Sequence, residues 1–344
     1  MKDLKLLIRP NIQALPPFAE TVKALSSSGK QARLDANENP HNAPHNRYPD
    51  PAQTAMRDAV AKLTGLRPEC ICMTAGTEEA IDLVYRVFCT PGKDNVVSVV
   101  PTRSIYKARA DINDVEFRSI RLEEKFSIKA EKLLSICNQH TKAILLCSPN
   151  NPTGNLLQEE ELEHLLDNFD GMVVVDESYA DFSDSTSIRS QLPRHHNLIV
   201  LNSFSHAQAC AGSRIGFVLA IPPVTEYFHR TRTPHNISYE AQVQMLDIIG
   251  RHFDVDKWVK HMREEKTRVM AAFRHLAYCE EVFPSESNFF LARFKDAQAV
   301  YRYLQSKNIA VADCSTLPLC ENCLRITIGL PNENSLLLGA LRQF

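Results

Sequence analysis

The arrangement of apolar and polar positions divides the chain into two parts. Between about residues 70 and 220, short β-branched runs alternate with helical patterns. The runs expected to form strands are Asn95–Val100, Ala143–Cys147, Met172–Val175, Leu198–Asn202 and Arg214–Ala220. Helices are predicted over Thr77–Cys89 and Gln158–Asn168, each with its apolar residues on one face. Because the strands have almost no polar side, helices must cover both faces of their sheet. This predicts a doubly wound α/β domain.

The last third of the chain has a different pattern. The elements expected there are a charged helix over Val255–His275, a strand over Phe289–Phe294, a helix near Gln298–Lys307, a strand over Leu324–Ile328 and a final helix from Asn334. This order is typical of a smaller α+β domain. Pro16-Pro17 and Ser26–Gly29 mark breaks near the N-terminus. We expect a large domain over residues 35–250, and a small domain over 251–344 that is completed by an N-terminal arm, residues 1–34.

Composition and charge narrow the class of protein. The chain has 344 residues, 44% of them hydrophobic, which is enough for a sizeable core in roughly two domains. With 39 Lys and Arg against 41 Asp and Glu, the net charge of −2 gives no reason to expect nucleic acid or a membrane as partner. No apolar run reaches the ~18 residues of a membrane span, and Met1–Pro10 is too short and charged for a secretory signal. We therefore expect a soluble, cytoplasmic protein.

Ten cysteines are spread along the chain. Cys320 and Cys323 have the spacing of half a zinc site, but no second pair follows within reach. In a chain without an export signal, free buried thiols are the commoner state. We therefore predict no metal site.

Two motifs suit an anion such as phosphate. Gly76-Thr77-Glu78 opens a helix and presents backbone N–H groups, although Thr77 acting as a simple helix cap would explain the same pattern. Further along, Ser203, Ser205 and Arg214 surround one turn. Hydroxyl groups combined with a guanidinium group are well suited to binding phosphate.

Two further motifs follow strands, where ligands bind in open α/β sheets. Asn151 lies in a turn after one strand, and Asp176 and Tyr179 lie at the end of the next. A buried aspartate at such a place needs a cationic partner or dense hydrogen bonding, and a protonated ring nitrogen would serve.

In this order and spacing, the motifs resemble the fold-type I pyridoxal-phosphate aminotransferases, most closely the histidinol-phosphate aminotransferase family. The resemblance covers nearly the whole chain, from Leu34–Pro40 and Arg47-Tyr48-Pro49 to Cys323–Gly329. It implies a mostly parallel sheet flanked by helices in a large domain, a smaller α+β domain, and a homodimer with shared active sites.

The resemblance also implies roles for individual residues. The cofactor would be bound by Gly76, Thr77, Glu78, Arg103, Asn151, Asp176, Tyr179, Ser203, Ser205 and Arg214, with Tyr48 reaching in from the partner subunit. Asp176 would pair with the pyridine nitrogen, while Asn151 and Tyr179 would bind the ring O3′. Arg325 would bind the substrate carboxylate, with Asn37 as a second substrate-binding residue.

Three positions depart from the family pattern. His206 stands where the family has the Schiff-base lysine, and an imidazole cannot form that covalent bond. Arg103 stands where the family has an aromatic residue stacked on the cofactor ring. Ala312 stands where histidinol-phosphate enzymes have an arginine for the substrate phosphate, so histidinol phosphate is not expected as a substrate.

These departures leave two main hypotheses. In the first, the protein binds pyridoxal or pyridoxamine phosphate without a covalent bond, and His206, titrating near neutrality, transfers protons on an amino or keto acid together with Asp176 and Tyr179. In the second, it is an inactive aminotransferase relative that serves as a binding or regulatory partner. A third reading, that His206 is an engineered replacement, fits poorly with the changes at Arg103 and Ala312.

Overall fold

A seven-stranded sheet forms the centre of the large domain. The computed structural model describes residues 3–25 and 32–344. The strands of this sheet are β1 (Ile71–Thr74), β2 (Asn95–Val100), β3 (Glu116–Arg121), β4 (Thr141–Cys147), β5 (Met172–Asp176), β6 (Leu198–Ser203) and β7 (Gly216–Leu219). Their spatial order is β1-β7-β6-β5-β4-β2-β3, and only β7 runs antiparallel to its neighbours. All five strands expected from the sequence are confirmed, and the mostly parallel sheet is too.

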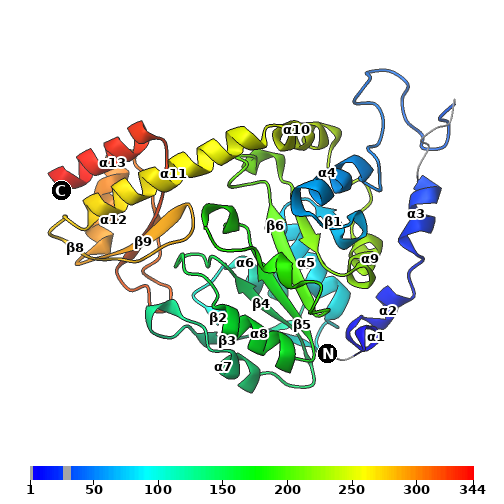
Figure 1. Ribbon diagram of the computed structural model, residues 1–344, viewed down its shortest axis with the longest axis horizontal. Coiled ribbons are helices and arrows are strands. Elements are labelled where there is room, and N and C mark those ends of the chain that lie inside the picture. Colours follow the sequence, from blue (N-terminus) through cyan, green and yellow to red (C-terminus); the bar gives the residue numbers. More distant parts are fainter. Residues whose placement is uncertain (1–2, 26–31) are drawn as a thin grey trace.

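Helices cover both faces of the sheet, as the apolar strands predicted (Figure 1). The helices of the large domain are α4 (Thr54–Thr64), α5 (Thr77–Phe88), α6 (Ile105–Ile112), α7 (Ala130–Ser135), α8 (Glu159–Asn168), α9 (Pro222–Thr231) and α10 (Tyr239–Gly250). Short 3-10 turns lie at Pro68–Cys70, Glu124–Phe126, Ala180–Phe182, Ile188–Gln191 and Ala211–Ser213. Neighbouring residues of one strand, such as Val173 and Val174, belong to different apolar clusters because successive side chains point to opposite faces.

The small domain contains a four-stranded antiparallel sheet, in the order β10-β11-β9-β8. Its strands are β8 (Cys279–Val282), β9 (Phe289–Phe294), β10 (Ala312–Asp313) and β11 (Cys323–Thr327), and its helices are α12 (Ala297–Ser306) and α13 (Pro331–Gln343). The 22-residue helix α11 (His252–Phe273) runs from the large domain into this one (Figure 1). The apolar core between α11, α13 and the sheet includes Phe273, Phe290 and Leu338.

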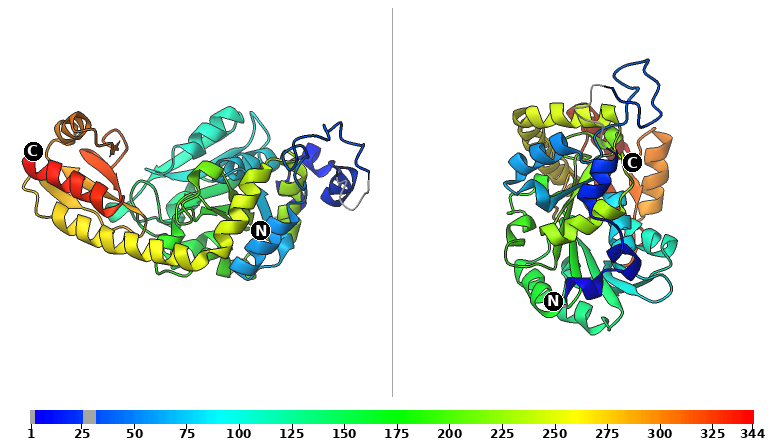
Figure 2. Two further views of the ribbon diagram at one scale, coloured as in Figure 1. Left: turned by 90° about the horizontal axis from the view of Figure 1, so that it is seen from above. Right: turned by 90° about the vertical axis from the view of Figure 1, so that its right-hand side faces the viewer.

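The N-terminal helices pack against the large domain, which differs from the expectation that they complete the small one. They are α1 (Leu4–Leu7), α2 (Pro10–Gln13) and α3 (Phe18–Leu25). Leu7 and Ile12 join the apolar cluster of α5, and the Arg9 N–H donates to the Val87 carbonyl at 3.0 Å. Figure 2 shows these helices and the small domain at opposite ends of the molecule. The break expected at Ser26–Gly29 lies outside the described residues, and the division at residues 35 and 250 stays a prediction.

The topology gathers the polar motifs at one edge of the large sheet. The parallel strands β4, β5 and β6 end side by side, and α5 begins beside β7. Arg325 lies on strand β11 of the small domain. Its side chain reaches Asn151, which follows β4 in the large domain. Within residues 3–25 and 32–344, no helix is both long and apolar enough to cross a membrane.

Candidate active site

Asp176 is the last residue of β5, and its side chain is only 1% exposed. Its Oδ1 accepts from the Ser178 backbone N–H at 3.0 Å and from Ser178 Oγ at 2.5 Å. Its Oδ2 accepts from the Tyr106 hydroxyl at 3.3 Å. Dense hydrogen bonding of this kind is what a buried carboxylate requires.

Arg103 forms an ion pair with Asp176 Oδ2 through its Nη1 atom. The Arg103 side chain is 14% exposed, and the same Nη1 lies 3.3 Å from Thr77 Oγ1. Burial is the largest single influence and disfavours the charged guanidinium, but Asp176 together with the smaller contributions of Tyr106, Cys147 and Tyr179 raises the pKa of Arg103 overall. The cation at Asp176 is therefore a side chain of the protein itself. The resemblance implies a different partner for Asp176, the pyridine nitrogen of the cofactor, and it places Arg103 near the cofactor ring.

A hydrogen-bonded chain joins the two domains at the site. Arg325 Nη1 donates to Asn151 Oδ1 at 2.5 Å, and Asn151 Nδ2 donates to the Tyr179 hydroxyl at 2.8 Å. The Arg325 guanidinium lies 5.3 Å from the centre of the Phe289 ring, and its buried Nε has no partner within the described residues. An unsatisfied buried donor is costly, so this edge of the site favours an acceptor such as a carboxylate.

His206 lies in the loop after β6 and stacks on Tyr179, with the ring centres 4.5 Å apart and the planes at 29°. Burial, followed by the positive charge of Arg103, lowers the pKa of His206 to about 4. The expectation that His206 titrates near neutrality is therefore wrong for this structure. At neutral pH its imidazole is uncharged and can accept a proton.

The anion motifs form a tight cradle at the start of α5. Gly76 has φ +81°, and a Cβ there would lie 2.8 Å from Arg214 Nη2. Gly216 approaches even more closely, because a Cβ on it would lie 2.6 Å from the Gly76 carbonyl carbon and 2.8 Å from the Thr77 nitrogen. The cap residue of α5 is Gly76 and it makes no side-chain cap bond, so the reading of Thr77 as a simple cap is wrong. The first N–H groups of a helix have no acceptor within the helix and are available to an anion.

Other predicted cofactor residues surround this cradle. Arg214 has φ +52° and its Nη2 pairs with Glu78 Oε2 at 3.1 Å. The Ser205 N–H donates to Ser203 Oγ at 3.4 Å in the turn after β6. Both guanidinium and carboxylate are about half exposed, so this ion pair is weak and can give way to a stronger anion.

Tyr48 and Asn37 lie apart from this group of residues. Tyr48 is 59% exposed and stacks on His235 at 5.0 Å between ring centres. Tyr48 and Asn37 line a separate shallow cavity together with Glu38 and Glu240. The structure describes a single chain, so the predicted reach of Tyr48 into a partner subunit stays a prediction.

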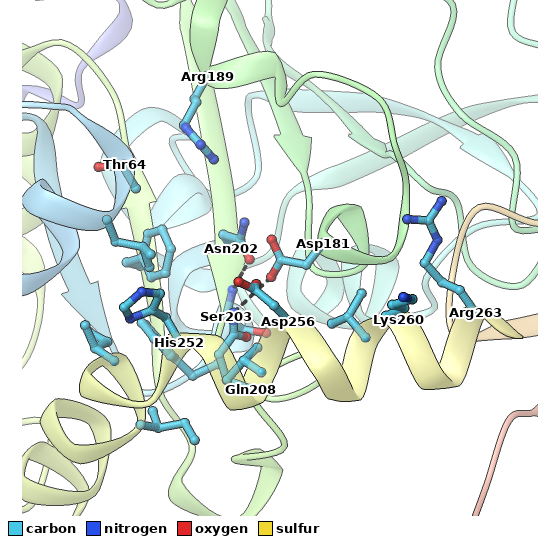
Figure 3. A pocket seen from close by; sticks show the side chains of 17 residues that line it. Thr64, Asp181, Arg189, Asn202, Ser203, Gln208, His252, Asp256, Lys260 and Arg263 are labelled. Atoms are coloured by element: carbon cyan, nitrogen blue, oxygen red, sulfur yellow. Dashed lines mark hydrogen bonds between the residues drawn. The ribbon is translucent and has the colours of Figure 1, made fainter. Parts of the chain in front are cut away.

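A cavity of about 370 Å³ lies beside the His206 loop (Figure 3). Ser203 lines it from the end of β6, Gln208 from the loop, and Asp256 from α11. Gln208 Nε2 donates to Asp181 Oδ2 at 3.0 Å. The loop that carries His206 is therefore fixed by Tyr179 stacking and by this hydrogen bond.

Two residues that the sequence did not assign to the site support the cradle, and only one of them, Glu79, could be recognised as an acidic residue near the helix start. Glu79 accepts from the Ala75 N–H at 2.5 Å and from Asn236 Nδ2 at 2.6 Å. Glu79 was visible as an acidic residue in the first turn of α5. Asn236 lies about 160 residues further along the chain and has no signal that the sequence reveals. Cys320 and Cys323 are buried free thiols.

This fold and this arrangement of residues are those of the fold-type I aminotransferase family. Residues 20–340 match the family described as aminotransferase class I and II, so the chain belongs to that family. It is similar to the histidinol-phosphate aminotransferase of Bacteroides fragilis, with 42% identity over 344 residues and 100% of both chains covered. The enzyme of the same name from Bacteroides thetaiotaomicron is 41% identical, over 100% of this chain and 99% of that one.

Solved structures have the same fold. The histidinol-phosphate aminotransferase of Clostridium acetobutylicum superposes with a TM-score of 0.80 at 20% identity, covering 87% of this chain and 90% of that one. The Sinorhizobium meliloti enzyme of that name, solved in complex with pyridoxal 5′-phosphate, gives a TM-score of 0.79 at 19% identity, covering 86% and 82%. The predicted fold class is confirmed.

Proposed function

We propose that this protein binds pyridoxal or pyridoxamine 5′-phosphate without a covalent bond and uses His206 to transfer a proton on an amino or keto acid. The observation that supports the proposal is the uncharged His206 imidazole stacked on Tyr179. The resemblance implies that His206 stands where the family has its Schiff-base lysine. The family and the bound cofactor of the Sinorhizobium meliloti structure support the choice of cofactor.

The residues present fit such a cofactor at three of four contacts. The cradle of Gly76, Gly216 and the start of α5 admits no Cβ and suits the phosphate. Asn151 and Tyr179 offer an amide and a phenol for O3′. The unpartnered Nε of Arg325 suits a carboxylate. At the fourth contact, Asp176 already holds a cation.

The side chains then have separable tasks. When bound, the cofactor supplies an electron sink for a negative charge that develops on the substrate carbon. Neutral His206 accepts a proton, and the stacking on Tyr179 keeps its ring in place. Arg325 of the small domain and Asn151 of the large domain, joined at 2.5 Å, orient the acid between them.

Histidinol phosphate is a poor substrate in this proposal. Ala312 of β10 lies opposite Arg325 of β11 in the strand register, so both side chains are on the same face of the sheet. A methyl group at this position cannot bind a phosphate. We propose another small amino or keto acid as the substrate, a homodimer as the working form and the cytoplasm as its location.

A second candidate function is a binding or regulatory partner without catalysis. The ion pair between Arg103 and Asp176 favours it, because that pair satisfies the buried carboxylate with no ligand present. A His206→Lys variant separates the two functions. If this variant attaches the cofactor covalently yet remains inert towards every acid tried, the binding role is favoured.

Calorimetry with pyridoxamine 5′-phosphate tests the proposed binding directly, and a panel of amino and keto acids tests turnover. Turnover is expected to vanish in His206→Ala and to persist in His196→Ala, whose side chain is exposed in a loop. No binding by the wild-type protein would overturn the proposed function.

A further inference from the structure

Arg103 is held at Asp176 by geometry as well as by charge. It lies in the segment between β2 and α6, and its Nη1 contacts three side chains at once: Asp176, Thr77 at 3.3 Å and Ser178 at 3.4 Å. These contacts join the segment to the first residue of α5 and to the end of β5.

Among the described residues, Arg103 is the one cationic side chain within 4.0 Å of the Asp176 carboxylate. The other donors, Ser178 and Tyr106, are neutral, and burial raises the pKa of Tyr106 further above its usual value. A buried carboxylate that loses its only cationic partner is strongly destabilised. In this structure Arg103 supplies the positive charge that balances Asp176.

A protonated ring nitrogen and the Arg103 guanidinium require the same carboxylate. Two cations at one buried carboxylate would repel each other, and one negative charge balances only one of them. The ring must therefore bind together with a departure of Arg103 from Asp176. Thr77 Oγ1, 3.3 Å from Nη1, keeps the guanidinium next to the anion cradle when it leaves.

We propose that Arg103 is an internal counter-ion that competes with the cofactor, so that binding exchanges one cation at Asp176 for another and Arg103 sets the affinity of the site. This inference rests on the proposed binding of pyridoxamine 5′-phosphate. Under this inference, the charge of Arg103 determines how tightly the site binds the cofactor. The resemblance implies an uncharged aromatic residue at this position in the family.

The test compares two ligands on four proteins by calorimetry. The ligands are pyridoxamine 5′-phosphate and its analogue in which C–H replaces the ring nitrogen; neither has an aldehyde that reacts with surface lysines. The proteins are wild type, Arg103→Met and Arg103→Lys, with Arg109→Met as the control. Arg109 lies on the adjacent helix α6, where its nearest acid is Asp82 at 4.0 Å.

Loss of the competing charge is expected to tighten pyridoxamine 5′-phosphate binding by at least about tenfold in Arg103→Met, because the empty variant leaves Asp176 without a cation. The analogue without the ring nitrogen is expected to gain no affinity in that variant. Arg103→Lys and Arg109→Met are expected to remain close to wild type for both ligands.

Equal affinity of wild type and Arg103→Met for pyridoxamine 5′-phosphate would overturn the inference and leave the proposed function standing. An equal gain for both ligands would also overturn it, because that result indicates relief of crowding rather than exchange of charge. If Arg103→Met binds while the wild type does not, the inference is supported and the proposed function fails. If neither protein binds, both fail.

Arg103→Gln is the second variant in case Arg103→Met does not fold, because glutamine donates a hydrogen bond to Asp176 without a charge. It is expected to show the same preference for the ligand with the ring nitrogen. Thermal unfolding of each variant without ligand checks that the fold is intact before affinities are compared.

Discussion

At the scale of single residues, the environment of His206 decides its chemistry. The ring is half-buried against Tyr179 and surrounded by the charges of three arginines, Arg103, Arg214 and Arg325. These surroundings favour the neutral imidazole. An imidazole that is uncharged at pH 7 can act as a base without first losing a proton to solvent.

The lowered pKa of His206 makes a prediction about stability. The folded protein holds His206 neutral down to about pH 4, whereas in the unfolded chain the ring takes up a proton near its ordinary pKa of 6.5. The unfolded chain therefore binds more protons between these values, and stability falls as pH falls through this window. In His206→Asn this loss is expected to be smaller, by on the order of 3 kcal/mol at pH 4.

Urea unfolding of wild type and His206→Asn across this pH range measures the difference. His229 is buried and its pKa is lowered as well, but it is unchanged in both proteins and cancels in the comparison. Identical pH dependence of the two proteins would show that His206 is not held neutral.

Restoring lysine at position 206 tests whether the site still matches the family. We expect His206→Lys to form a covalent bond with pyridoxal 5′-phosphate, because Asn151, Tyr179 and the cradle remain in place. Borohydride reduction and peptide mass analysis locate the bond. His196→Lys, in an exposed loop, controls for random labelling. Labelling at 206 no greater than at 196 would argue against a cofactor site.

At the scale of elements, β7 packs against the start of α5 at Gly216. A Cβ on this residue would lie 2.6 Å from Gly76, so Gly216→Ala must push β7 and α5 apart. We expect the free energy of unfolding to fall by about 1–3 kcal/mol and pyridoxamine 5′-phosphate binding to weaken. Gly212→Ala is the control, because nothing lies within 4 Å of a Cβ there. A loss of stability in both variants alike would contradict the close approach.

At the scale of strands, the sequence pattern failed to predict β3, β8 and β10, which lie at the edges of the two sheets. Several helices of the large domain, among them α4, α6 and α9, were not predicted either. Strand β3 alternates exposed and half-buried residues, and β8 and β10 lie at the two edges of the small sheet. Central strands carry long apolar runs because both faces are covered, whereas edge strands have a polar side and look like loops. The pattern therefore reveals the centre of each sheet better than its borders.

In the candidate site, too, some features could be predicted from the sequence and others could not. Asp176, Asn151 and Tyr179 were predictable because they end adjacent parallel strands, which must meet at one edge. The ion pair between Arg103 and Asp176 could not be predicted, because it depends on the path of a long side chain through the folded site. The neutral state of His206 likewise depends on its burial in the folded protein and on the charges of Arg103 and Arg325, which lie far away in the sequence.

At the scale of the whole molecule, the predicted dimer can be tested through Tyr48. If Tyr48 completes the site of the partner subunit, then Tyr48→Ala and Asp176→Asn each disable both sites of a homodimer. Mixed dimers would contain one intact site, so refolding the two variants together is expected to recover roughly a quarter of the native sites. Calorimetric stoichiometry with pyridoxamine 5′-phosphate measures this recovery. No recovery despite mixed dimers would contradict shared sites.

Helix α11 has a mechanical consequence for the whole molecule. Its first turns, with Val255 and Asp256, form a wall of the cavity beside the His206 loop, and its last turns, with Phe273, belong to the small-domain core. At 1.5 Å per residue, its 22 residues make a rod about 33 Å long. A rotation of the small domain that shifts Arg325 must therefore also tilt this rod and change the width of the cavity. The position of Arg325 and the packing behind the His206 loop are therefore mechanically coupled through α11.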